Sequence, residues 1–97
     1  MIEVRQTNSF RVWVEALDIE ASARILSRLD RVAAGNFGDT KSVGGGVSEL
    51  RVNWGPGYRL YYTRQGKTVI LLLCGGDKGS QSRDVRKAQQ MLMELKG

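Results

Sequence analysis

Residues 47–74 read VSELRVNWGPGYRLYYTRQGKTVILLLC, and this stretch decides the fold. Apolar and polar side chains alternate along 47–53 and again along 58–64, which is the pattern of strands with one buried face. Residues 68–74 are apolar at every position but the first, as in a strand that is buried on both faces. Short glycine-containing segments separate the three runs and are typical of turns. The stretch therefore predicts a meander of three antiparallel strands.

The rest of the chain supplies a short strand and three helices. Residues 2–6 alternate apolar and polar side chains, which predicts the strand. Apolar residues at helical spacing over 10–17 and again over 25–33 predict two helices, and their short link indicates a helical hairpin. The glycine-rich segment 35–46 predicts a flexible surface loop. A last amphipathic helix is expected to begin within 80–82.

The predicted order of elements is β-α-α-β-β-β-α, which corresponds to an α+β fold. The length suits a single domain over residues 1–97 with one modest core. We expect the helical hairpin to pack on one face of an antiparallel four-stranded sheet. The sequence leaves open whether the terminal helix docks on the sheet or extends from it.

Two residue counts exclude whole classes of chemistry. The chain has no histidine, which rules out Ser–His and Cys–His catalysis and removes the commonest metal ligand. Its one cysteine, Cys74, can form neither an internal disulfide nor a multi-cysteine zinc site. Because Cys74 ends an apolar strand, we expect a buried structural thiol. We expect no metal and no cofactor.

The hydropathy pattern bears on localisation. The longest apolar run, Val69–Cys74, has six residues, far fewer than the roughly 20 of a membrane span. Glu3, Arg5 and Gln6 stand where a signal peptide would need an apolar stretch. We therefore expect a cytoplasmic protein that does not enter the membrane.

The net charge of +5 is unevenly distributed along the chain. Residues 1–40 carry a net charge of −1, whereas residues 41–90 carry nine Lys and Arg against three Asp and Glu. A positive half favours a polyanionic partner, and nucleic acid is the first candidate, although the charge can also serve solubility alone. Arg24, Arg28 and Arg31 lie on one side of the second helix, where we expect them to face solvent.

The alternation in the strands places a set of chemically useful side chains on one concave sheet face. The set is completed by a lysine after the last strand and comprises Glu49, Arg51, Arg59, Tyr61 and Lys78. Arginine binds phosphate oxygens through two parallel hydrogen bonds and stays cationic while the phosphorus gathers negative charge. The set therefore predicts a catalytic site for an RNA phosphodiester, in which the neighbouring 2′-hydroxyl attacks. A lysine or Glu49 could accept the hydroxyl proton, and a lysine or Tyr61 could protonate the leaving oxygen.

Four further basic residues are candidates for RNA binding, namely Lys41, Arg83, Arg86 and Lys87. The last three lie at the start of the final helix, where positive charge opposes the helix dipole by a few tenths to about 1 kcal/mol. A phosphate ligand explains this placement. A solvated helix face explains it equally, just as a surface ion pair would explain Glu49 beside Arg51.

The sequence resembles the RelE/ParE superfamily of bacterial toxins, and most of all its HigB-like branch of addiction-module killer proteins. The resemblance covers nearly the whole chain and is carried by four segments in this order, Gly35–Asp39, Val47–Arg51, Gly57–Tyr62 and Leu72–Lys78. By position, Arg51 and Arg59 match the strand arginines of the family pattern, and Lys78 matches the basic position after the last strand. RelE itself uses a tyrosine near its C-terminus, whereas no tyrosine follows Tyr62 here, and the histidine of many HigB sites is absent.

The resemblance implies a toxin of a type II toxin–antitoxin system. RelE-like members cut mRNA in the ribosomal A site without a metal, using basic residues of the sheet face. The implied partners are mRNA, the ribosome and a cognate antitoxin, often one with a helix-turn-helix domain. The alternatives are a ParE-like inhibitor that binds DNA gyrase without cutting RNA, and an RNA-binding module without catalysis.

Overall fold

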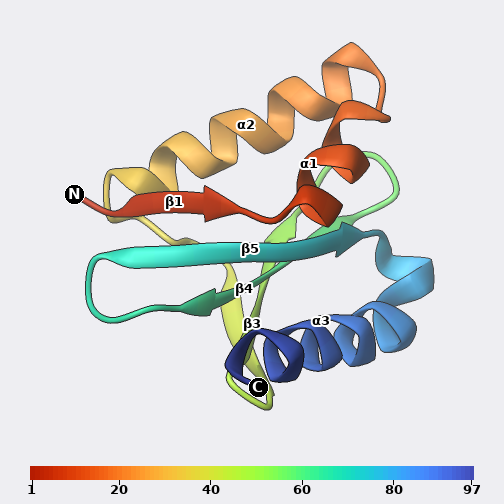
Figure 1. Cartoon of the computed structure of the whole chain (residues 1–97). Helices are drawn as coiled ribbons and strands as arrows, with labels where there is room; N and C mark the ends of the chain where they lie inside the picture. Colours follow the sequence, from red (N-terminus) through yellow and green to blue (C-terminus); the bar gives the residue numbers. More distant parts are fainter.

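The computed structural model describes all residues from 1 to 97 and contains a five-stranded sheet with helices on both faces. The elements are β1 (Glu3–Gln6), α1 (Asn8–Glu15), α2 (Ile19–Ala33), β2 (Thr40–Gly44), β3 (Val47–Val52), β4 (Tyr58–Arg64), β5 (Val69–Gly76), the short 3-10 helix η1 (Lys78–Ser80) and α3 (Gln81–Lys96). Figure 1 shows α1 and α2 above the sheet and α3 below it. The predicted α+β class is confirmed.

The predicted meander forms from β3, β4 and β5. Antiparallel pairing sets Leu50 opposite Leu60, and β4 continues against β5. Leu50, Leu60 and Tyr62 point toward α1 and α2, as the alternation predicts, and share one core with buried residues of both helices. Asp18 caps α2, since its Oδ1 accepts a hydrogen bond of 2.8 Å from the backbone N–H of Ala21.

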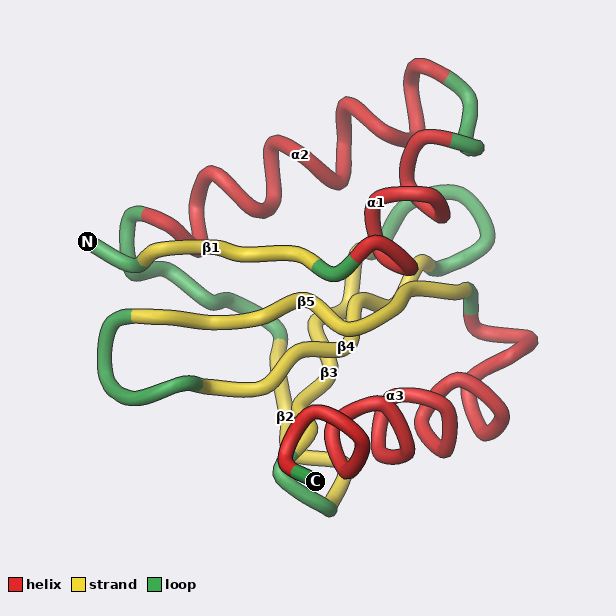
Figure 2. Tube along the Cα trace, viewed as in Figure 1, coloured by secondary structure: helices red, strands yellow, loops and turns green.

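The prediction of four strands is wrong, because part of the segment expected to be a loop forms β2. This strand pairs antiparallel with β3 and occupies the edge of the sheet remote from β1 (Figure 2). The Thr40 hydroxyl donates a hydrogen bond of 2.7 Å to the carbonyl of Glu49. Gly44, Gly45 and Gly46 have φ values of 94°, 65° and 82°, a conformation that glycine adopts without strain. These glycines therefore close a tight hairpin.

The sheet is also mixed rather than purely antiparallel. β1 runs parallel to β5, with Val4 opposite Ile70. The chain leaves β1 through two helices, so no tight hairpin imposes an antiparallel arrangement. Because β1 covers the outer edge of β5, the apolar strand β5 becomes an interior strand, as its sequence predicts.

The terminal helix α3 docks on the face opposite α1 and α2. A second core joins sheet and helix residues there, and it consists of Val47, Tyr61, Leu73, Cys74, Ala88 and Leu92. A bulge shifts the β4–β5 register, so that Tyr61 pairs with Cys74 but Tyr62 pairs with Leu72. Leu73 and Cys74 therefore both reach this core. Burial raises the pKa of the Cys74 thiol to about 11, in keeping with the predicted structural role.

No helix has the combination of length and apolar character that a bilayer crossing requires.

Candidate functional site

The strand register brings the predicted site residues of β3 and β4 together on one face. Arg51 pairs directly with Arg59, and Glu49 pairs with Tyr61 in the neighbouring row. Directly opposite residues of an antiparallel pair point to the same face, with their Cβ atoms about 4.5–5.5 Å apart. The expectation that the two arginines project from adjacent strands to the same side is therefore confirmed.

The expectation of an open concave face is wrong, because α3 covers much of it. Glu49 and Tyr61 are completely buried. Burial raises the pKa of the Tyr61 phenol well above its usual range, and its hydroxyl has no hydrogen-bond partner in the protein. Tyr61 thus belongs to the packed second core and does not stand at a surface where it could protonate a leaving group.

Glu49 is engaged by two donors, one of which the sequence analysis missed. Arg51 Nε donates to its carboxylate at 2.9 Å, and Gln81 Nε2 of α3 donates at 2.7 Å. This hydrogen bond to the Glu49 carboxylate raises the pKa of Arg51, which therefore stays cationic. Glu49 acts as a positioning residue that holds the Arg51 side chain, of which 31% is exposed. No spacing rule in the sequence pointed to Gln81.

Arg59 is the most unusual member of the set. Only 8% of its surface is exposed, it forms no ion pair, and its Nε has no acceptor in the protein. A buried charge without a partner is costly, so buried guanidinium groups are nearly always paired. An anion seated beside Arg59 would supply the missing acceptor, and the partly exposed Arg51 lies directly across the strand pair.

Lys78 enters from the end of β5 and lies near the same end of the sheet. A Cβ added to Gly57 would lie 3.5 Å from the Lys78 Cβ, so the lysine packs beside the β3–β4 turn. Its side chain is exposed, and it forms no ion pair. Asp77, just before it, is occupied as a cap, since its Oδ1 accepts from the backbone N–H of Gly79 at 2.8 Å. Lys78 is thus an exposed cation without an ion pair near the arginine row, which is the Arg51–Arg59 pair, since Gly76 two residues before it lies opposite Arg59.

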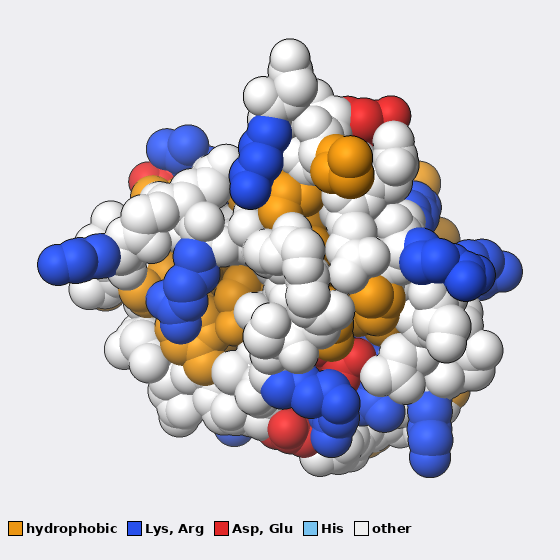
Figure 3. All heavy atoms as spheres, turned by 90° about the horizontal axis from the view of Figure 1, so that it is seen from below, with side chains coloured by type: hydrophobic (Ala, Val, Ile, Leu, Met, Phe, Trp, Pro, Cys, Tyr) orange, Lys and Arg blue, Asp and Glu red, His pale blue; other side chains and the backbone are white.

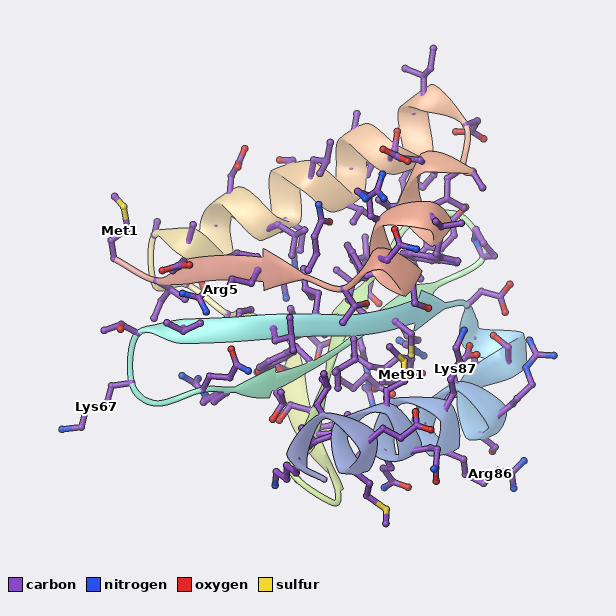
Figure 4. The ribbon with its side chains drawn as sticks, viewed as in Figure 1. Met1, Arg5, Lys67, Arg86, Lys87 and Met91 are labelled. Carbon is purple, nitrogen blue, oxygen red and sulfur yellow. The ribbon has the colours of Figure 1, made fainter.

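The predicted RNA-binding residues of α3 gather at the N-terminal end of the helix. Arg83 and Arg86 line a hollow of about 610 Å³ with Lys78, and no hydrophobic residue lines it. Figure 4 shows Arg86 pointing away from the sheet, while Lys87 extends toward the end of β5. Figure 3, which views the α3 side, shows basic side chains spread over this face with few acidic ones among them. Arg83 is near Asp84, with 3.8 Å between Nε and Oδ1.

Lys41 lies apart from this group. β2 sets it opposite Glu49 at the edge of the sheet, where it is exposed. Two strands, β3 and β4, separate β2 from β5, whose end leads to Lys78. Lys41 therefore lies one row from the Arg51–Arg59 pair, at the β2 edge of the same face, but far from Lys78 and the start of α3.

The expectation that Arg28 faces solvent is also wrong. It is 5% exposed, whereas its neighbours Arg24 and Arg31 on α2 are exposed as predicted. The i, i+4, i+7 spacing identified the helix face but gave no sign that the loop before β2 folds over its centre.

Nowhere does the structure gather three or more Cys, Asp or Glu side chains into a group able to hold a metal ion.

Comparison with known proteins relates the chain to one family. A family model described as "Phage derived protein Gp49-like (DUF891)" matches residues 12–95. That family is toxin-like and related to the RelE and HigB types of toxin. A protein of Haemophilus influenzae described as "Uncharacterized protein" is 42% identical over 95 residues, which cover 97% of this chain and 96% of the relative. On both matches, the chain belongs to the family of phage-derived Gp49-like proteins.

Proposed function

We propose that the protein is the toxin of a type II toxin–antitoxin system and that it cleaves mRNA on the ribosome. The observation that carries the proposal is the buried, unpartnered guanidinium of Arg59 beside the partly exposed Arg51. Such a pair suits the two non-bridging oxygens of a phosphodiester. Membership of a toxin-like family and the positive charge of residues 41–90 support the same reading.

The proposed reaction uses a nucleophile that the RNA itself provides. The 2′-hydroxyl oxygen attacks the adjacent phosphorus, the bond to the 5′-oxygen breaks, and the products are a 2′,3′-cyclic phosphate and a 5′-hydroxyl. Arg51 and Arg59 stabilise the negative charge that builds on the phosphoryl oxygens. The step needs one group to accept the hydroxyl proton and one to protonate the leaving oxygen.

Of the predicted acid–base groups, Lys78 has the geometry that suits proton transfer best. Tyr61 is buried beneath α3, and Glu49 is occupied by Arg51 and Gln81. Lys78 is exposed and free of ion pairs near the arginine row. We assign it the protonation of the leaving 5′-oxygen, while a ribosomal or substrate group accepts the hydroxyl proton.

The proposed partners are mRNA, the ribosome and a cognate antitoxin. The positive charge of residues 41–90 suits an acidic or amphipathic antitoxin segment. Co-expression with the neighbouring reading frame checks this partner, because a complex should copurify, and two proteins that separate on the first column would contradict it.

Primer extension on mRNA after brief expression tests the nuclease. We expect codon-phased breaks with wild type, and a loss of at least 100-fold in cleavage for Arg59→Met and Arg51→Ala, because removing one charge-stabilising donor costs about that much. Lys78→Ala should lose about 100-fold or more. Lys67→Ala is the matched control, since Lys67 is exposed at the opposite end of the molecule (Figure 4). This variant should cleave mRNA as wild type does.

One observation favours a second candidate, a ParE-like inhibitor of DNA gyrase that acts by binding. α3 covers Glu49 and Tyr61 and presents Arg83 and Arg86 to solvent. Unbroken mRNA together with accumulating DNA damage would support this alternative and contradict the nuclease. If both mRNA and DNA stay intact, the remaining candidate is a protein that binds RNA without cutting it.

A further inference from the structure

A hollow of about 400 Å³ lies between α2 and the edge of β3, and Arg51 is the one residue assigned to chemistry that lines it. β2 begins at Thr40, opposite Leu50, so Arg51 and Val52 at the end of β3 have a paired strand on the β4 side only. Only two of its ten lining residues are hydrophobic. Four arginines line it, namely Arg24, Arg28 and Arg31 of α2 and Arg51 of β3.

The centre of the hollow is a second buried guanidinium without a carboxylate partner. Arg28 is 5% exposed and forms no ion pair, and its one hydrogen bond reaches the carbonyl of Asp39 at a long 3.5 Å. Gly38, with φ of 62°, folds over it so closely that an added Cβ would lie 2.8 Å from Arg28 Nη2. Burial, and then the charge of Arg31, lower the pKa of Arg28.

The positive charge of the hollow is not cancelled by its lining. Asp39 is the one acidic residue there, and its carboxylate forms no ion pair with any of the four arginines. The loop thus closes over Arg28 and offers it one weak acceptor. A buried cation in this position is stabilised by an anion that enters the hollow.

An aromatic stack forms one wall. Trp54 stacks on Tyr58 with 6.4 Å between ring centroids and 22° between ring planes. The Arg24 guanidinium lies 5.1 Å from the centroid of the Trp54 ring. Unpaired nucleic-acid bases stack on aromatic rings and on arginine planes in the same manner. The wall therefore suits a base, while Arg28 and Arg31 suit the phosphate attached to it.

We propose that this hollow binds one nucleotide of single-stranded RNA, with its phosphate against Arg28 and Arg31 and its base on the Trp54–Arg24 stack. Arg51 lines the hollow and also pairs with Arg59 on the other face. The bound nucleotide is then a neighbour of the scissile linkage. This last assignment rests on the proposed nuclease, whereas RNA binding in the hollow does not.

The test measures binding without cleavage. A fluorescein-labelled single-stranded RNA with 2′-O-methyl groups cannot be cut, so its anisotropy reports affinity alone for the full chain. Arg24→Ala and Arg31→Ala change exposed side chains, and circular dichroism checks that each variant is folded. We expect each to bind about five- to tenfold more weakly, and we expect Arg31→Ala, which loses a phosphate contact, to lower the salt dependence of log K by about 0.7. Lys67 is equally exposed but remote from the hollow, so the RNA affinity of Lys67→Ala should stay within twofold of that of wild type.

A second pair of measurements tests the base. Trp54→Leu should weaken binding more than fivefold to the normal oligonucleotide and have no effect on an abasic one. Affinities of Arg24→Ala and Arg31→Ala equal to that of Lys67→Ala would overturn the site. Poly-glutamate that binds as tightly as RNA and is insensitive to Trp54→Leu would overturn the RNA assignment in favour of an acidic protein segment.

These outcomes separate the hollow from the nuclease. Normal binding by Arg31→Ala together with lost cleavage in Arg59→Met would refute the hollow and leave the proposed function standing. Weakened binding by Arg31→Ala when even wild type leaves mRNA intact would support the hollow and refute the nuclease.

Discussion

Gly76→Ala tests whether α3 covers the candidate site as described. Gly76 lies at the end of β5, opposite Arg59, and a Cβ added there would stand 1.8 Å from Asp84 Oδ2 and 2.8 Å from Ser80 Oγ. Asp84 cannot easily move aside, because it is 6% exposed and accepts a hydrogen bond from the Ser80 hydroxyl. The start of α3 would therefore have to shift away from the sheet.

The expected cost follows from these contacts. Overpacking a well-packed site costs about 1–3 kcal/mol, and losing the acceptor of a buried hydrogen bond adds about 1 kcal/mol. Replacing a glycine within a strand by alanine stabilises the folded state by about 0.5–1 kcal/mol, which offsets part of this cost. We expect Gly76→Ala to lower the free energy of unfolding by roughly 2–3 kcal/mol, which in a domain of this size lowers Tm by roughly 10–20 °C.

Urea and thermal unfolding, followed by circular dichroism and tryptophan fluorescence, measure the change. Gly79→Ala is the control, because its added Cβ would lie no closer than 3.2 Å to Asp77 Oδ1 and its φ lies outside the left-handed region. It should cost less than about 1 kcal/mol. In an Asp84→Ala background the nearest clash is gone, so the cost of Gly76→Ala should fall by at least about 1 kcal/mol. Two results would refute the described packing of α3 on the sheet. One is the same loss of unfolding free energy in both backgrounds, and the other is a Gly76→Ala variant as stable as wild type.

Two more predictions concern single buried groups. Arg59→Met removes a buried donor that has no acceptor, so the free energy of unfolding should stay the same or rise by about 1–2 kcal/mol. Inorganic polyphosphate should raise the Tm of wild type more than that of the variant, which keeps the other basic residues. A loss of stability above about 1 kcal/mol would indicate a structural role for Arg59. The Cys74 thiol has a pKa of about 11 in the folded chain, so its contribution to stability is complete below pH 9 and is lost as the pH rises toward 11. The stability advantage of wild type over Cys74→Ala should therefore shrink by about 1–2 kcal/mol between pH 8 and pH 10.5 in urea titrations, and an unchanged difference would contradict the burial of the thiol.

The sheet face of the β3 residues and of Tyr58–Tyr62 in β4 could be predicted because the side-chain period of a strand is two, whereas the bulge that turns both Leu73 and Cys74 to one face could not. Leu50 and Leu60 point to α1 and α2, while Arg51 and Arg59 point to the other side, as alternation requires. This pattern is local and survives any change in the neighbouring elements. It therefore also sets Arg51 directly beside Arg59 once the β3–β4 turn fixes the register.

What lies above a face could not be predicted in the same way. The stripe of α3 is amphipathic whether the helix docks on the sheet or on another protein, so its sequence does not reveal that it buries Glu49 and Tyr61. The strand β2 was hidden by its glycines, which serve the hairpin turn rather than a flexible loop. The parallel pairing of β1 depends on contacts more than 60 residues apart.

The same limit applies to charge, and it bears most directly on function. The sequence gives the number of arginines but not which of them form ion pairs with carboxylates. Arg51 forms such a pair, whereas Arg28 and Arg59 are buried and form none. These two lie on opposite faces of the sheet, Arg28 under the loop before β2 and Arg59 under the start of α3, and Arg51 at the edge of β3 reaches toward both. A stable fold would gain from replacing either buried cation by an apolar side chain. Both lie near the end of β3 that β2 leaves uncovered, since Arg59 of β4 pairs with Arg51 and Arg28 lines the hollow that Arg51 also lines. The two proposed sites together therefore suit a single polyanion that crosses this edge with one phosphate on each face.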